Sequence, residues 1–470
     1  MVLKFVNSMG NRLEVFKPIK DGFVGLYTCG PTIYNYAHIG NMRAYVWEDI
    51  LKRYLVFSGF KVKHVMNFTD VEDKIIKYSN QKKVSIYDYT APFKKAFTED
   101  LHSLNILPAD VYPEATQYIP EMVELIHKLI DKGFAYKGDD GSIYFSIKKF
   151  KNYGKLSGID LKKLKSGVRV KLDEYEKEGA SDFALWKAWD ENDGPAYWDT
   201  DLGKGRPGWH IECSAMSAKN LGDTFDIHCG GVDNKFPHHE NELAQSEAAS
   251  GKKFVNYWLH CEHLMVNGMK MSKSLGNFYT LRDLLKMDLD PIAIRYVLLY
   301  SQYRQSINFT LDAVKDAEKT LAGVNSFIER LRLVNNYIKG ASIKIFVDKA
   351  TEGFTKAMDS DLNVPLAMKY VFDFIKSINK LIDSGELDKD CALSAIGFLK
   401  RVDSVIGVFD FKEKFFELTS EQEKLVEERI NAKKAKNWVR ADEIRDLLKK
   451  QGIELVDNKD GTILAKSAKI

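Results

Sequence analysis

The chain has 470 residues, of which 45% are hydrophobic and 29% charged, as in a globular protein of about three domains. Its 69 basic and 66 acidic residues leave a net charge of +3, so a polyanionic partner would have to bind local patches rather than the charge of the whole molecule. Segment 1–20 has no signal-peptide core, and no apolar run is long enough to span a membrane. We therefore expect a cytoplasmic protein.

The N-terminal part of the chain predicts an alternation of strands and helices. Segment 22–29 is typical of a buried strand, segment 41–57 has a helical apolar pattern, and segment 61–67 predicts a second strand. This order indicates a doubly wound parallel sheet of the Rossmann type. Ligands of such folds bind beyond the carboxyl ends of the strands, where segments 29–41 and 67–70 would lie.

Three later regions have other residue patterns. Between about 121 and 204, one amphipathic helix is followed by short strand-like segments, which predicts an insertion in the sheet domain. From about residue 311, helical periodicity dominates and predicts a helical bundle. The last stretch, from about 421, predicts one strongly charged helix followed by a small hairpin.

Two separate segments contain residues suited to phosphate binding. His38 and Gly40 precede Asn41 at the predicted start of a helix, where backbone NH groups and the helix dipole favour an anion. Lys270 and Lys273 lie three residues apart in a loop that also contains serine and glycine, and two lysines so placed can neutralise a triphosphate. Either segment alone would more often be an ordinary surface turn or loop.

Together the two segments resemble the signature motifs of class I aminoacyl-tRNA synthetases, in the order found in that family. The second motif, Lys270-Met-Ser-Lys273-Ser, matches at all five positions. The first, His38-Ile-Gly40-Asn41, matches at three of four, because Asn41 stands where the family has a second histidine. The resemblance implies an ATP site with His38, Gly40 and Lys273, and leaves open whether Asn41 contributes a phosphate contact.

Several possible metal ligands are scattered along the chain. Five cysteines with no Cys-x-x-Cys pair argue against a disulfide framework and against a zinc finger. Cys29 and Cys213 can supply thiolates, which we expect at two strand ends. Pro237 predicts a helix start, so that His238 and Glu242, four residues apart, would share a helical face. Spacing alone does not rank His238 against His239, or Glu242 against Glu240.

The whole chain from Phe5 to Leu464 is similar to the cysteinyl-tRNA synthetases. That resemblance implies one zinc ion per chain with ligands Cys29, Cys213, His238 and Glu242. It also implies that Thr69 and Trp209 shape a cysteine pocket and that Asp233 lies near it. Zinc would select cysteine because a thiol loses its proton on coordination and is a soft ligand, whereas the hydroxyl of serine stays protonated. We therefore expect no editing domain.

The family also implies the reaction and its partners. The carboxylate of L-cysteine attacks the α-phosphorus of ATP, which carries Mg²⁺, and the resulting cysteinyl-adenylate reacts with the terminal ribose of tRNA(Cys). Such chemistry requires alignment and charge stabilisation, which His38, Lys270 and Lys273 would supply. We expect a monomer. One alternative is a related ligase that joins cysteine to a small amine, but segment 421–470 favours the tRNA enzyme. The other is a noncatalytic tRNA-binding protein with a structural zinc, against which the presence of both signature motifs argues.

The resemblance places the anticodon-binding part after the bundle. A basic stretch there lacks acidic residues and includes an aromatic ring: Arg429, Lys433, Lys434, Lys436, Trp438 and Arg440. By pattern alone a solvated basic helix is also an explanation.

The expected segments are two halves of the catalytic domain at 1–120 and 205–262, the insertion at 121–204, a signature-loop and stem-contact region at 263–318, the helical bundle at 319–418 and a small α/β tRNA-binding domain at 419–470.

Overall fold

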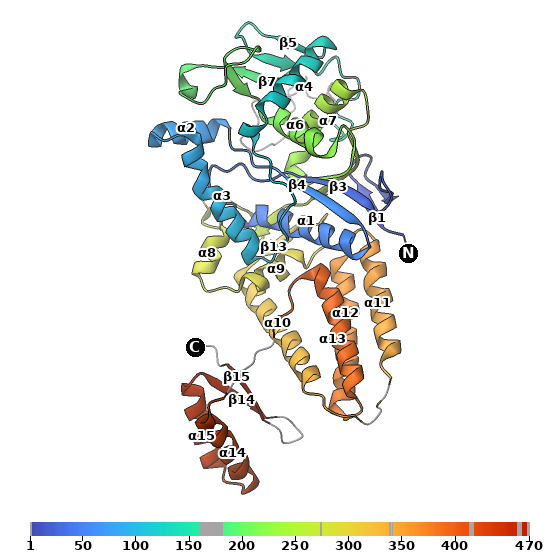
Figure 1. Ribbon diagram of the computed structural model, residues 1–470, viewed down its shortest axis with the longest axis vertical. Helices are drawn as coiled ribbons and strands as arrows, with labels where there is room; N and C mark the ends of the chain where they lie inside the picture. The colour runs from blue at the N-terminus through green and yellow to red at the C-terminus, as the bar shows by residue number, and fades with distance from the viewer. Residues whose placement is uncertain are drawn as a thin grey trace. The chain divides into compact units, whose positions relative to one another are not determined.

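The computed structural model (Figure 1) describes residues 2–159, 182–272, 275–337, 340, 342–412, 418–457 and 463–467. The chain divides into two compact units, residues 1–409 and residues 410–470.

A parallel sheet forms the centre of the first unit, with the strand order β10-β9-β3-β4. Its strands are β3 (Phe23–Thr28), β4 (Lys61–Met66), β9 (Phe225–Gly231) and β10 (Val255–Cys261). The connecting helices are α1 (Ile39–Phe57), α6 (Trp209–Leu221) and α7 (His238–Ser250). The predicted doubly wound sheet is thus confirmed, and the first strands of its two halves, β3 and β9, are neighbours at its centre.

Smaller elements surround this sheet. The hairpin of β1 (Lys4–Asn7) and β2 (Arg12–Val15) packs beside β10, where Asn7 accepts a hydrogen bond from the backbone of Trp258. Helices α2 (Asp73–Lys82) and α3 (Ile86–Ser103) follow β4, and the short turn η1 (Ala115–Gln117) precedes the next region.

The region between residues 119 and 207 carries its own antiparallel sheet, with the order β5-β6-β7-β8. It contains α4 (Ile119–Asp131), β5 (Ala135–Lys137), β6 (Ile143–Phe145), β7 (Phe183–Ala188), η2 (Glu191–Asp193) and β8 (Gly205–Pro207). Residues 160–181 of this region lie outside the described part of the chain.

The polypeptide then passes through a small sheet into a set of long helices. The sheet consists of β11 (Leu264–Val266), β12 (Met269–Lys270) and β13 (Ile307–Phe309), with α8 (Leu281–Lys286) and α9 (Pro291–Leu299) between them. The long helices are α10 (Leu311–Arg332), α11 (Lys344–Asp359), α12 (Val364–Asp383) and α13 (Lys389–Ile406), which stand side by side in Figure 1. Buried residues recur three and four apart along each of them, as the helical periodicity predicted.

The second unit contains two helices where the sequence predicted one. These are α14 (Ser420–Lys434) and α15 (Trp438–Lys450), followed by the hairpin of β14 (Ile453–Asp457) and β15 (Ile463–Ser467). The prediction of one helix was wrong because Lys436 has a positive φ of 57° and Asn437 caps a new helix through its side chain. The first feature ends α14 and the second begins α15, although the surrounding charges continue without a break. The expected hairpin is confirmed.

Candidate active site and metal centre

The first signature loop connects β3 to α1 and ends in a capped helix start. His38 is the N-cap of α1: its Nδ1 accepts a hydrogen bond from the backbone NH of Asn41 at 3.2 Å, while Asn41 Oδ1 accepts from the backbone NH of His38 at 3.2 Å. Since Nδ1 is an acceptor, the ring proton lies on Nε2. Burial lowers the pKa of His38 to about 4, so the ring is a neutral donor at neutral pH. In this chain Asn41 therefore completes a capping box.

The structure brings the two signature motifs into contact. A Cβ atom on Gly40 would lie 2.7 Å from Cε of Met271, so the absence of a side chain there allows the second motif to approach. The backbone NH of Ile39 also donates to the carbonyl of Tyr279 at 2.9 Å. Lys270 is exposed at the end of β12, and Lys273 and Ser274 lie outside the described residues.

Asn277 organises the second loop, and sequence reasoning did not single it out. Its side chain is buried, accepts from the NH of Ser272 at 2.8 Å and donates to the carbonyl of Lys270 at 3.2 Å. The signal available in the sequence was its position three residues after the second motif.

Four residues predicted as zinc ligands lie together beyond the carboxyl ends of the strands. The ligand atoms of Cys29, Cys213, His238 and Glu242 are all within 4.8 Å of one another, and all four side chains are buried. Cys29 follows β3, whereas His238 and Glu242 come from the first turns of α7. Two thiols, an imidazole and a carboxylate are a suitable donor set for zinc.

Cys213 reaches this cluster from a helix and not from a strand end, so that expectation was wrong. It lies in α6, which begins at Trp209 directly after β8. Eight consecutive residues of this helix, 210–217, are buried. A helix buried on all sides lacks an amphipathic period, and for that reason the sequence did not distinguish it from a buried strand.

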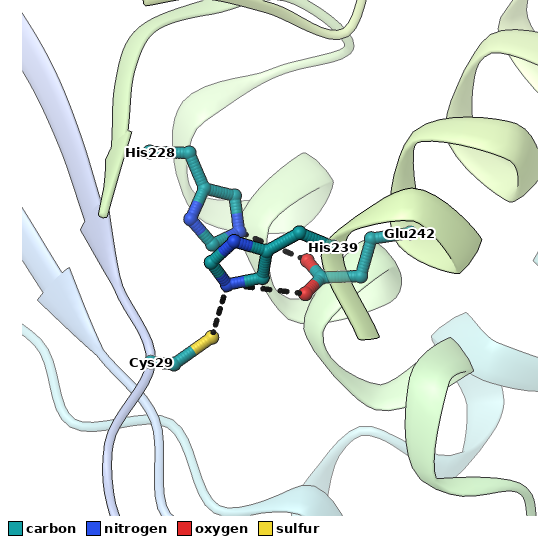
Figure 2. A group of neighbouring side chains, drawn as sticks. All are labelled: Cys29, His228, His239 and Glu242. Carbon is teal, nitrogen blue, oxygen red and sulfur yellow. Dashed lines mark hydrogen bonds and ion pairs between the residues drawn. The ribbon is translucent and has the colours of Figure 1, made fainter. Parts of the chain in front are cut away.

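A second group overlaps the first. The ligand atoms of Cys29, His228, His239 and Glu242 also lie within 4.8 Å of one another, and Figure 2 shows them pointing toward a common centre. His239 Nε2 is 3.2 Å from Cys29 Sγ, and His228 Nε2 is 3.0 Å from Glu242 Oε2. The neighbours His238 and His239 therefore both face the cluster, one on the side of Cys213 and the other on the side of His228.

Other imidazoles hold these histidines in place. His238 Nε2 is 3.0 Å from Glu242 Oε1, and its Nδ1 is 2.9 Å from Nδ1 of His210. His239 Nδ1 is 2.8 Å from Nε2 of His260. Groups that bind the second ring nitrogen orient a histidine toward a metal. The sequence reasoning missed both His210 and His260 as parts of this site.

The acidic groups of the cluster compete for protons. Burial raises the pKa of Cys29, and its contact with Cys213 raises it further. For Cys213, the effect of burial is outweighed by hydrogen bonds with Cys29 and His238, and its pKa falls to about 6. For Glu242, the effect of burial is outweighed by attraction to His228 and His238, and its pKa falls to about 2. A divalent cation would stabilise all these anions at once, so the residues fit zinc.

Thr69 and Trp209, predicted as pocket residues, lie beside the cluster. Thr69 follows β4, and its hydroxyl donates to Oε2 of Glu212 at 3.1 Å. The ring of Trp209 stacks on that of His238 with 4.3 Å between the centroids. Glu212, which sequence reasoning did not select, is buried, and its Oε1 has no hydrogen-bond partner among the described residues.

Asp233 is less closely tied to this cluster. It lies in η3 (Val232–Lys235) with an exposed side chain, and its Oδ1 is 3.4 Å from Nε2 of His263.

The basic residues predicted to contact tRNA lie on both helices of the second unit. Lys433 and Lys434 are in the last turn of α14, and Trp438, 58% exposed, begins α15. Arg429 is buried and donates to the carbonyl of Ala441 at 3.2 Å. Arg440 pairs with Glu428 at 2.9 Å and with Glu443 at 3.0 Å. These two arginines thus already have partners within the unit.

The comparisons with known proteins all indicate the same family. Residues 15–319 match the family model described as the class I (C) tRNA synthetase catalytic domain, and residues 353–410 match the DALR domain. The cysteine–tRNA ligase of Protochlamydia amoebophila (strain UWE25) is 46% identical over 467 residues, which cover 99% of this chain and 98% of that protein. The chain belongs to the cysteine–tRNA ligase family.

Further relatives support the same assignment. The cysteine–tRNA ligases of Brachyspira hyodysenteriae and Chlamydia pneumoniae are each 50% identical, over 97% and 98% of this chain and 98% and 97% of their own lengths. Methionyl-tRNA synthetase of Mycobacterium tuberculosis in complex with methionyl-adenylate has a similar fold, with a TM-score of 0.61 at 14% identity over 82% of this chain and 90% of that chain. The resemblance to cysteinyl-tRNA synthetases, a class I family of ligases, is therefore confirmed.

No helix within the described ranges has both the length and the apolar character needed to cross a membrane. This finding agrees with the sequence, in which no apolar run of that length occurs.

Proposed function

We propose that this cysteine–tRNA ligase activates L-cysteine with ATP and transfers it to tRNA(Cys), and that zinc held by Cys29, Cys213, His238 and Glu242 selects the amino acid. The observation that carries the proposal is the convergence of these four ligand atoms within 4.8 Å, at the end of the sheet where the first signature loop begins. Zinc bound there would favour sulfur over oxygen as a ligand, which separates cysteine from serine more sharply than shape can. The same preference makes an editing site unnecessary.

The residues around the cluster would position the amino acid and ATP. Thr69 and Trp209 would form the walls of the cysteine pocket beside His238. His38 would donate from Nε2 to a phosphate oxygen at the start of α1, where the helix dipole adds to the attraction. Lys270 and Lys273 would neutralise the charge that develops on pyrophosphate while the cysteine carboxylate displaces it from the α-phosphorus, with Mg²⁺ bound to the ATP. No side-chain nucleophile is required.

The similarity to relatives over almost the whole chain, including residues 410–470, favours the tRNA enzyme over a ligase that joins cysteine to a small amine. We expect residues of the basic C-terminal stretch to contact the anticodon stem-loop. We expect the protein to act as a monomer in the cytoplasm.

Two assays on the purified protein test this function. Cysteine-dependent ATP–pyrophosphate exchange reports activation, and charging of a tRNA(Cys) transcript reports transfer. We expect both activities, with serine supporting neither at equal concentration. Absence of exchange in zinc-replete protein would eliminate the proposed activation, and exchange without charging would favour the small-amine ligase.

A further inference from the structure

Five aromatic rings form a connected set between the first signature loop and helices α2 and α3. We call this set the tyrosine strip: Tyr34, Tyr36, Tyr78, Tyr89 and Phe93. The ring of Tyr78 is stacked with those of Tyr34 and Tyr89, at centroid distances of 6.5 and 6.2 Å. Phe93 continues the set, at 5.5 Å from Tyr89 and 5.3 Å from Tyr36. Each ring is thus in contact with another ring of the strip.

Part of the strip is fixed in the protein interior, and part of it faces solvent. Tyr89 is buried, and its hydroxyl donates to the carbonyl of Tyr34 at 2.9 Å. Tyr36 and Tyr78, in contrast, are 42% and 37% exposed. Single exposed aromatic residues are common on protein surfaces, but exposed rings held by a connected aromatic base form an ordered surface on which a flat group can stack.

Positive charges accompany the rings. Lys74 lies 5.1 Å from the centroid of Tyr34, and Lys82 lies 5.3 Å from that of Tyr89. The guanidinium of Arg282 lies 5.4 Å from that of Tyr36 and is also paired with Glu99 and Asp100 of α3. Segment 73–83 contains four lysines and a single acid, Asp73, which pairs with Arg206 and Lys187. Aromatic rings interleaved with cations are the combination that binds single-stranded nucleic acid, since bases stack on the rings while cations attract the phosphates.

The strip also lies next to the signature motifs. Tyr34 and Tyr36 belong to the loop between Cys29 and His38, and Arg282 belongs to α8, the next helix after the second motif. Toward the other side, Asn80 of α2 donates to the carbonyl of Asn192 at 2.9 Å, so α2 is anchored to the insertion. A single-stranded nucleic acid that lies across the strip would therefore reach the first signature loop.

We propose that the tyrosine strip binds the unpaired 3′ end of the tRNA by base stacking and directs it toward the signature loop. This inference rests on the proposed function, in which the 3′ end of the tRNA has to reach that loop to receive the amino acid. Tyr78 is the central ring, since it is exposed and stacks with two neighbours.

The test compares two tRNA(Cys) transcripts, one complete and one without its last three nucleotides, in binding assays at fixed salt. For the unaltered protein we expect truncation to weaken binding about tenfold, the effect of losing stacked bases. Tyr78→Ala should weaken binding of the complete transcript to a similar extent and should bind both transcripts equally. Tyr78→Phe keeps the ring and should behave like the unaltered protein, as should Tyr337→Ala, which removes an 83% exposed tyrosine of the helical region.

A second variant tests the electrostatic part. Lys82→Gln should reduce the slope of log Kd against log salt concentration by about 0.7 for the complete transcript, the value for one phosphate contact on a single strand. The inference is overturned if Tyr78→Ala loses as much affinity on truncation as the unaltered protein, or if Lys82→Gln leaves the slope unchanged. Pyrophosphate exchange needs no tRNA, so its absence in the unaltered protein would count against the proposed function and not against the strip.

Discussion

Cys213 offers the most direct test of the proposed metal centre, because its buried thiol forms hydrogen bonds with both Cys29 and His238. We expect Cys213→Ser to contain little zinc and to activate cysteine at least about a hundredfold more slowly, since a hydroxyl is a poor zinc ligand. Metal analysis and pyrophosphate exchange would measure the two effects. Cys391→Ser is the control, as this cysteine is outside both ligand groups. Unchanged zinc content in Cys213→Ser would show that the ligand set is incorrect.

His38 caps α1 and, in the proposed function, also donates to a phosphate oxygen, and one substitution can distinguish these two roles. In His38→Asn the new side chain can still cap α1, because asparagine is a favoured N-cap residue, but the Nε2 donor is lost. We expect kcat of adenylate formation to fall about a hundredfold, the usual effect of removing one donor to developing charge, with little change in KM for cysteine. Thermal unfolding should remain near that of the unaltered protein. A large loss of stability with unchanged kcat would mean that His38 is structural only.

The four proposed ligands were chosen from the sequence only through resemblance to a family, and the structure shows why the residues alone did not suffice. His238 and His239 are adjacent on α7, and Nε2 of each lies within 4.0 Å of Oε1 of Glu242, so both belong to possible ligand groups. Glu212 escaped notice for a related reason. It precedes Cys213 on a helix that is buried all round, so nothing in the local pattern marks the face on which it lies.

At the level of elements, Arg295 of α9 joins the catalytic part to the helical bundle. Its side chain is fully buried and bonds Asp49 of α1 at 2.6 Å, the carbonyl of Leu104 at 3.0 Å and that of Ile406 in α13 at 2.9 Å. We expect Arg295→Met to lower the free energy of unfolding by about 3 kcal/mol, because the carboxylate and both carbonyls stay buried with fewer partners. Urea denaturation followed by circular dichroism would measure this.

The matched control for that substitution is Arg330→Met. Arg330 also forms an ion pair between two helices, with Asp383 at 2.7 Å, but both side chains are partly exposed. Pairs of this kind contribute about 1 kcal/mol or less. Equal destabilisation by the two substitutions would contradict the view that burial makes Arg295 important.

Elements with a clear period were predicted best. The parallel strands β3 and β4 and the long helices from α10 to α13 have apolar residues at the expected spacing, and the structure contains all of them. The division between α14 and α15 was missed because it depends on the backbone of Lys436, and a lysine gives no sequence signal for a positive φ. The period of the apolar residues thus predicts which face of a helix or strand is buried. A break between two helices depends instead on the backbone conformation of single residues.

For the first unit as a whole, buried neutral histidines make stability depend on pH. His64 on β4 is buried and lies 2.9 Å from the hydroxyl of Thr28, and burial lowers its pKa from 6.5 to about 3. The unfolded chain therefore takes up a proton below pH 6.5, while the folded chain does not. Stability that is fully present above this pH is lost as the pH falls, by about 2 kcal/mol between pH 6.5 and 5 for this group.

Replacing that histidine should remove its share of the dependence. We expect the urea midpoint of the unaltered protein to fall from pH 6.5 to 5, and the fall to be smaller in His64→Gln. Tryptophan fluorescence would follow the transition, because six of the seven tryptophans belong to residues 1–409. Identical pH profiles for the two proteins would show that His64 is not the group responsible.

The two compact units of the molecule should separate activation of cysteine from charging of the tRNA. Every residue assigned here to ATP, cysteine or zinc lies within 1–409, and the second unit has a core of its own made by Ile444, Leu448, Ile453 and Leu455. Removal of residues 410–470 should therefore leave pyrophosphate exchange near its original rate. The kcat/KM for charging tRNA(Cys) should fall about a hundredfold, because the proposed contacts of the basic helices with the tRNA would be lost. Parallel assays on the shortened and complete chains would measure both. If pyrophosphate exchange fell as far as charging, the second unit would be required for activation of cysteine. The expectation that it acts only in tRNA binding would then be wrong.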